Sequence, residues 1–149
     1  GNSKERIHIV FEELLEIRNK IEIKPFLILR MHPKNEPNDY SQYFNEIDKI
    51  SYDVDPLEDI LCSDLIIGST TIFLMEAFYA GRPTLSIIPK KGEEEWCPSA
   101  LHGLTPFAYT RDQIESELKN YQLRSSKKAL DFSKGHNTIV SIIKPLLKI

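Results

Sequence analysis

The feature that most constrains this chain is a short apolar run that ends in a glycine and three hydroxyl residues. The run is Asp64-Leu-Ile-Ile-Gly-Ser-Thr-Thr71, and a helical pattern carrying Glu76 follows it to Ala80-Gly-Arg-Pro83. Such a run is typical of a buried strand, and Ser or Thr is typical of a helix start. The N-H groups of a helix N-terminus, helped by hydroxyl groups, bind anions without a metal ion. The pattern therefore predicts a phosphate-binding corner with a nucleotide as its ligand.

Composition limits the alternatives. With 149 residues, 41% of them hydrophobic and 28% charged, the chain is predicted to form one compact domain. A net charge of -3 gives no support to a broad nucleic-acid or membrane-binding surface. Cys62 and Cys97 lack metal-ligand spacing, which predicts no metal site and favours a reduced cytoplasmic protein, with a disulfide as the open alternative. No apolar run approaches the ~18 residues of a membrane span, and no signal-peptide core is present. We interpret Gly1 to Ser3 as a remnant of an expression vector.

Strand-like and helix-like patterns alternate along the chain, which predicts an α/β fold with a parallel sheet and crossover helices. The predicted strands cover residues 26–31, 50–52, 65–67, 84–88 and 107–109. The predicted helices cover residues 4–22, 40–47, 56–62, 71–79, 111–121, 125–133 and 136–147. Asp55 is expected to cap the third of these helices, and Gly81 to end the fourth. The irregular segment 89–106 is long enough to indicate a functional or mobile loop.

Polar residues gather where the predicted strands end. Arg30 and His32 follow the first strand, Asp53 and Asp55 follow the second, and residues 69–71 follow the third. Ligands of open parallel sheets bind at the carboxyl ends of the strands. The convergence of these residues at one edge of the sheet therefore predicts a binding site there.

Three motifs, in this order, resemble the C-terminal domain of the GT-B glycosyltransferases. They are Arg30-Met-His-Pro33, Asp53-Val-Asp-Pro-Leu57, and Ser63 to Thr71 continued by Glu76-Ala77 and Gly81-Arg-Pro83. The resemblance spans residues 26–90. Within that superfamily it is strongest to enzymes of bacterial surface polysaccharides: CDP-glycerol glycerophosphotransferases, capsule and polysialyltransferase-type enzymes, and UDP-N-acetylglucosamine 2-epimerases. It implies that residues 1–149 form a single Rossmann-like domain with three α/β/α layers and a parallel sheet of about five strands, one half of a GT-B fold.

The resemblance also implies roles for individual residues. The implied nucleotide-binding residues are Arg30, His32, Pro33, Val54, Gly68, Ser69, Thr70, Thr71 and Glu76. Ser69 and Thr70 match the pair that binds the donor phosphate, and Glu76 matches a helix carboxylate that contacts the ribose. The backbone around Val54 would border the base, and His32 is also the candidate catalytic residue.

The implied activity is transfer from a CMP-, CDP- or UDP-linked donor, which is a substrate, so that no cofactor is expected. In GT-B enzymes the acceptor site, and usually the catalytic base, lie on an N-terminal domain. These residues are therefore expected to be the C-terminal half of a larger enzyme, inactive alone, whose other half is its main partner. The full protein is compatible with peripheral membrane association, and no nucleic-acid partner is expected.

Two other functions stay open at this stage. One is a UDP-N-acetylglucosamine 2-epimerase, although the Ser-Gly-Gly helix start of that family is absent and Ala77 stands where a second acidic residue is usual. The other is a non-catalytic module that senses a nucleotide or binds a protein. Each site residue also has an ordinary structural explanation: Ser69 and Thr70 as helix caps, Glu76 as a solvated helix residue, and His32 as a surface histidine.

Overall fold

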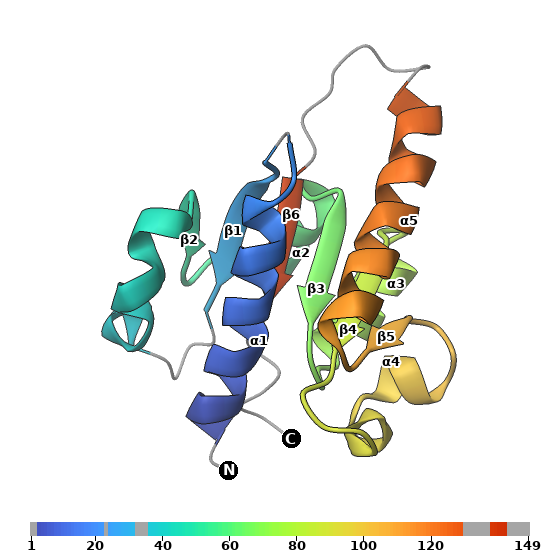
Figure 1. The fold of residues 1–149 in the computed structure, drawn as a ribbon, viewed down its shortest axis with the longest axis horizontal. Coiled ribbons are helices and arrows are strands. Elements are labelled where there is room, and N and C mark those ends of the chain that lie inside the picture. The colour runs from blue at the N-terminus through green and yellow to red at the C-terminus, as the bar shows by residue number, and fades with distance from the viewer. Residues whose placement is uncertain (1–2, 23, 32–35, 130–137, 143–149) are drawn as a thin grey trace.

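The computed structural model describes residues 3–22, 24–31, 36–129 and 138–142 (Figure 1). The strands are β1 (Phe26–Arg30), β2 (Lys49–Ser51), β3 (Leu65–Gly68), β4 (Thr84–Ile87), β5 (Phe107–Ala108) and β6 (Thr138–Ile142). The helices are α1 (Ser3–Asn19), α2 (Pro56–Leu61), α3 (Phe73–Tyr79), α4 (Pro98–Leu101) and α5 (Arg111–Ala129), with 3-10 helices η1 (Pro37–Glu46) and η2 (Glu93–Trp96). The alternation of strands and helices confirms the predicted α/β class.

All strand pairs in the described part of the chain are parallel, in the order β2-β1-β6-β3-β4-β5. The five predicted strands correspond to β1 through β5. The predicted number of about five is nevertheless wrong, because the described residues contain a sixth strand. The carboxyl ends of the strands lie together at the lower edge of the sheet in Figure 1.

The sixth strand is the largest departure from the sequence prediction. The sequence predicts a helix over residues 136–147, of which the structure describes 138–142. These five residues, Thr138–Ile142, form β6, paired with β1 on one side and β3 on the other. Its Thr-Ile-Val-Ser-Ile sequence is rich in β-branched residues, which favour strands because their χ1 angles are restricted. A continuous run of this kind is typical of a strand buried inside a parallel sheet.

Other element boundaries differ as well. The sequence predicts separate helices over 111–121 and 125–133, but α5 runs without a break from Arg111 to Ala129. Residues 130–133 lie outside the described residues. Residues 122–129 contain no Gly or Pro that would end the helix. The segment 89–106, predicted to be irregular, contains the short helices η2 and α4.

Helices cover both faces of the sheet, and each face has its own hydrophobic cluster. Leu27 and Leu29 point toward the cluster that includes α1 and α5, whereas Ile28 points toward the cluster that includes α2, α3 and α4. Figure 1 shows α1 and α5 on the near side. Because successive strand residues point to opposite faces, the central strands β1 and β3 contribute to both clusters.

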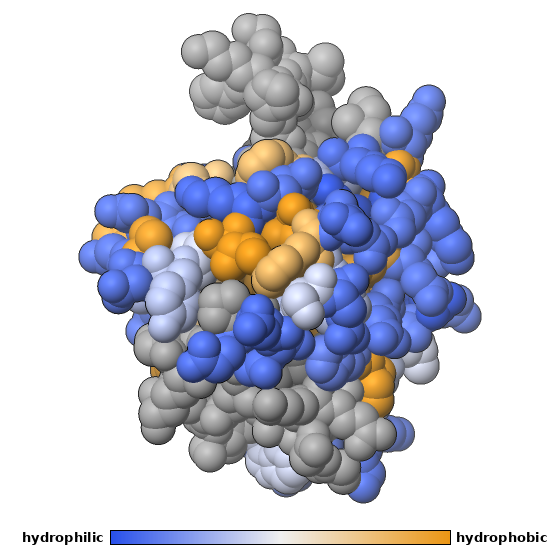
Figure 2. All heavy atoms as spheres, turned by 90° about the vertical axis from the view of Figure 1, so that its left-hand side faces the viewer, coloured by the Kyte–Doolittle hydropathy of each residue, from blue (hydrophilic) through white to orange (hydrophobic). Residues whose placement is uncertain are grey.

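The side of the molecule formed by the edge strand β2 and by η1 is mainly hydrophilic, with a small hydrophobic group exposed in its middle (Figure 2). The strand itself has only three residues and begins with the exposed Lys49. A short edge strand with an exposed lysine discourages pairing with another sheet. Among the described helices, none combines the length and apolar composition that a membrane crossing requires.

Candidate functional site

The corner between β3 and α3 places three consecutive hydroxyl residues in the interior. Ser69 is 1% exposed, Thr70 is 3% exposed, and Thr71 is also buried. Thr71 Oγ1 accepts a hydrogen bond of 2.9 Å from the backbone N-H of Phe73, the first residue of α3. Thr71 therefore satisfies a helix N-H group, and α3 begins two residues later than the predicted start at Thr71.

The other two hydroxyl groups of this corner have no such partner. Ser69 Oγ and Thr70 Oγ1 are buried without a hydrogen bond in the described structure. The backbone beside them is held firmly, because Ser86 Oγ on β4 donates a 2.7 Å hydrogen bond to the carbonyl oxygen of Ser69. A buried polar group without a partner costs about 1–3 kcal/mol and needs an explanation such as a ligand or a water molecule. Ser86 is a supporting residue that the sequence analysis did not identify.

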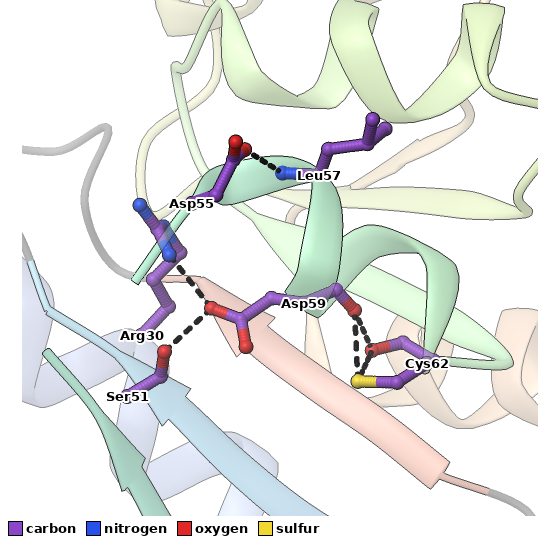
Figure 3. Close-up of polar contacts among 7 residues, drawn as sticks. Arg30, Ser51, Asp55, Leu57, Asp59 and Cys62 are labelled. Carbon is purple, nitrogen blue, oxygen red and sulfur yellow. Dashed lines mark hydrogen bonds and ion pairs between the residues drawn. The ribbon is translucent and has the colours of Figure 1, made fainter. Parts of the chain in front are cut away.

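Arg30 brings a cationic side chain to the end of β1. It is 5% exposed, and its Nη1 donates a 2.7 Å hydrogen bond to Oδ2 of Asp59 on α2 (Figure 3). Its guanidinium carbon lies 5.6 Å from the centre of the Phe73 ring. Arg30 therefore contacts the first residue of α3 across the sheet face that α2 and α3 cover. Its Nε is buried with no hydrogen-bond partner in the described structure.

Asp59 is the residue of this site that the sequence analysis missed. It is 2% exposed, and its Oδ2 also accepts a 2.6 Å hydrogen bond from Ser51 Oγ at the end of β2. Figure 3 shows this oxygen between Arg30 and Ser51. The side chains of Cys62 and Ser63 donate to the Asp59 carbonyl oxygen, which fixes the end of α2.

The local sequence around α2 explains both its position and the missed residue. Asp55 Oδ1 accepts a 2.8 Å hydrogen bond from the N-H of Leu57, so the predicted cap is confirmed (Figure 3). Asp59 and Ile60 are the buried residues of the helix. Two features of the sequence could have identified Asp59. It lies next to the apolar Ile60 in a short helix, and Arg30 lies in a buried strand, where its charge needs a carboxylate as a partner.

The other residues predicted to bind the nucleotide are His32, Pro33, Val54, Gly68 and Glu76. His32 and Pro33 lie outside the described residues. Gly68 is the buried last residue of β3, and Val54 is half-buried between β2 and α2. Glu76 is exposed on α3. The roles of all these residues in nucleotide binding stay predictions.

The three unpartnered atoms define what the site can bind. A guanidinium Nε is only a donor, whereas a hydroxyl group donates or accepts. A ligand that satisfies Arg30 must therefore present an acceptor, and a phosphoryl oxygen is a suitable acceptor for each of the three atoms. Within the described residues, no group of three or more His, Cys, Asp or Glu side chains is arranged to hold a metal ion.

Away from this corner, a hollow of the surface about 280 Å³ in volume lies between α1, α5 and the ends of β4 and β5. Arg111 there donates hydrogen bonds of 2.6 and 2.9 Å to the carboxylate of Glu13. These bonds lower the pKa of Glu13 below its usual value. Arg111 also forms an ion pair with Glu16, so its charge is already compensated and it is not free to bind a ligand in this hollow.

Comparison of the chain with protein-family models, curated proteins and solved structures finds no match. Its function is therefore inferred from its residues and their geometry.

Proposed function

We propose that this domain binds a nucleotide-activated donor, a nucleotide sugar or CDP-glycerol, as part of a glycosyltransferase of surface polysaccharide biosynthesis. The observation that carries the proposal is the pair of buried, unpartnered hydroxyl groups of Ser69 and Thr70 at the end of β3. They occupy the positions that match the donor-phosphate pair of the sialyltransferase-like and glycerophosphotransferase-like enzymes. A phosphoryl group would supply the acceptors that these hydroxyl groups lack.

The topology supports the same assignment. The strand order is β2-β1-β6-β3-β4-β5. The chain builds the sheet outward toward one edge from β1 to β2, and then toward the opposite edge from β3 through β4 to β5. Ligands of open α/β sheets bind where the direction of winding changes, at the carboxyl ends of the strands. Arg30 and Ser69 flank that region. The proposal therefore includes a Rossmann-like α/β/α domain that forms one half of a GT-B fold.

In the proposed mechanism, the described residues stabilise the leaving nucleotide. Ser69, Thr70 and Arg30 Nε donate hydrogen bonds to the phosphoryl oxygens as negative charge develops on them. Because α3 begins only at Phe73 and Thr71 occupies its first free N-H group, these side chains supply the main donors. Glu76 binds ribose hydroxyl groups, and His32 adds a hydrogen bond or a proton to the phosphate. The acceptor and the catalytic base belong to another domain.

The combined substitution Ser69→Ala and Thr70→Ala tests this proposal. We expect it to reduce the affinity for CDP or UDP at least about tenfold, since two donors are lost. The matched control is Thr84→Val, which removes a buried hydroxyl from the opposite end of β4. Calorimetry of the three proteins decides the matter: an unchanged affinity in the double variant contradicts the assignment.

A non-catalytic α/β module is the second candidate. The observation that favours it is the buried ion pair between Arg30 and Asp59, which gives Arg30 a structural partner without any ligand. Absence of binding by CMP, CDP, UMP and UDP at millimolar concentration would support this alternative. An epimerase activity would be recognised by analysing the products that the full-length protein forms from UDP-N-acetylglucosamine.

A further inference from the structure

Asp59 gives the candidate site an electrostatic property that its donor atoms alone do not have. Its carboxylate and the Arg30 guanidinium are both almost fully buried and are joined by a 2.7 Å contact. The positive charge of Arg30 is therefore already balanced, while its Nε still lacks an acceptor. The unpartnered donors of Arg30, Ser69 and Thr70 are therefore accompanied by little net positive charge.

We propose that Asp59 makes this site selective for a singly charged, esterified phosphate over a terminal phosphate with two charges. The inference rests on the proposed function and names the class of ligand that the site accepts. Each negative charge that enters a buried site loses hydration and must be compensated there. One delocalised charge is accommodated by the three donors. A second charge finds no free cation among the described residues of the site, because Asp59 occupies Arg30.

This selectivity suits a donor-binding domain. In an intact CMP-sugar, CDP-glycerol or UDP-sugar, the single phosphate that would occupy the site is esterified and carries one charge, whereas the released nucleotide ends in a phosphate whose second pKa is about 6. The site would thus bind the intact donor more tightly than the nucleotide product. Asp59 acts through Arg30 and is a positioning residue, since no contact with the ligand is required of it.

The test compares CMP with its methyl ester, and UMP with its methyl ester, by calorimetry at pH 8. Each pair differs by one methyl group and one charge. For the wild-type protein we expect the ester of at least one base to bind about tenfold more tightly, a factor that corresponds to about 1.4 kcal/mol. Equal or tighter binding of both monoesters by the wild-type protein would overturn the inference, without any need for a variant.

Asp59→Asn then removes the compensating charge and keeps the shape of the side chain. We expect the preference for the ester to fall below about threefold, mainly through tighter binding of the monoester. The matched control is Glu58→Gln, which removes a charge from an exposed position on the same helix and should leave the preference intact. A folded Asp59→Asn protein that keeps the full preference would overturn the inference. If the protein binds these ligands without preferring the esters, the inference fails and the proposed function stands. If it binds none of CMP, UMP and their two methyl esters, the inference and the proposed function are both overturned.

Discussion

Ser69 and Thr70 are held in the interior with hydroxyl groups that the described structure leaves unpaired, although neighbouring hydroxyl groups are paired. Thr71 caps α3, and Ser86 binds the backbone of Ser69. The local architecture therefore satisfies the groups that support the corner and leaves free the two that face a ligand in our proposal. Functional sites commonly contain such unfavourable features, which lower the stability of the protein without ligand.

This interpretation predicts that removing the unpaired hydroxyl groups stabilises the ligand-free protein. Ser69→Ala and Thr70→Val should each raise the free energy of unfolding by about 1 kcal/mol, because each removes a buried group without a partner. Thr84→Val should lower it, by about 1–3 kcal/mol, because it leaves Thr105 Oγ1 without its 2.9 Å partner. Urea unfolding measures all three. Destabilisation by both corner substitutions would show that the hydroxyl groups have structural partners.

At the level of elements, the helix ends and strands that depend only on neighbouring residues in the sequence were predictable. The cap at Asp55 is observed, and Gly81 ends α3 with a φ of 82°, a conformation that glycine adopts without strain. Strands β1 through β5 follow short apolar runs bounded by turn residues. The position of β6 was not predictable in this way, because a run of isoleucine and valine fits both periods and only its pairing with β1 and β3 decides between them.

The cap of α2 has a measurable effect because this helix carries Asp59. Asp55→Ala removes the acceptor for the N-H of Leu57, and we expect a loss of about 1 kcal/mol in the free energy of unfolding. Asp55→Asn keeps an acceptor and should recover most of that stability. Thermal and urea unfolding of the two variants test the expectation. Equal stability of the alanine variant and the wild-type protein would contradict it.

The packing of η1 against α1 predicts a loss of stability at high pH. Burial, followed by the nearby charge of Asp39, raises the pKa of Tyr40 to about 12, and burial likewise raises the pKa of Tyr43 to about 12. The phenols ionise near pH 10 in the unfolded chain. Folding therefore favours the protonated forms, and their contribution to stability is complete below pH 10 and is lost as the pH rises through 12.

Tyr40→Phe should reduce this loss, because a phenylalanine has no group to ionise. The matched control is Tyr52→Phe, at a tyrosine that is 48% exposed. Urea unfolding between pH 8 and pH 11 gives the slope of stability against pH for each protein. A slope that is the same in wild-type and Tyr40→Phe proteins would show that Tyr40 ionises normally in the folded state.

At the scale of the whole molecule, the site depends on contacts between distant parts of the chain. Arg30 and Asp59 are 29 residues apart, and β6 enters the middle of the sheet from the far end of the sequence. The parallel α/β class and the strand ends that carry polar residues were predictable from local patterns. The ion pair between Arg30 and Asp59 and the unpaired hydroxyl groups of Ser69 and Thr70 were not predictable. They depend on which side chains become buried together in the fold, and local sequence patterns do not determine this.

The most direct test of the central claim is a nuclear magnetic resonance titration of the wild-type domain with CMP, CDP, UMP and UDP. Our account predicts saturable shifts for at least one of these nucleotides, concentrated at Arg30, at residues 68–73 and at Ser86, and absent from the β4 end near Thr84. The base that gives the tighter binding identifies the donor as cytidine-linked or uridine-linked. Shifts confined to other surfaces, or none with any of the four at millimolar concentration, would contradict the claim that this corner binds a nucleotide.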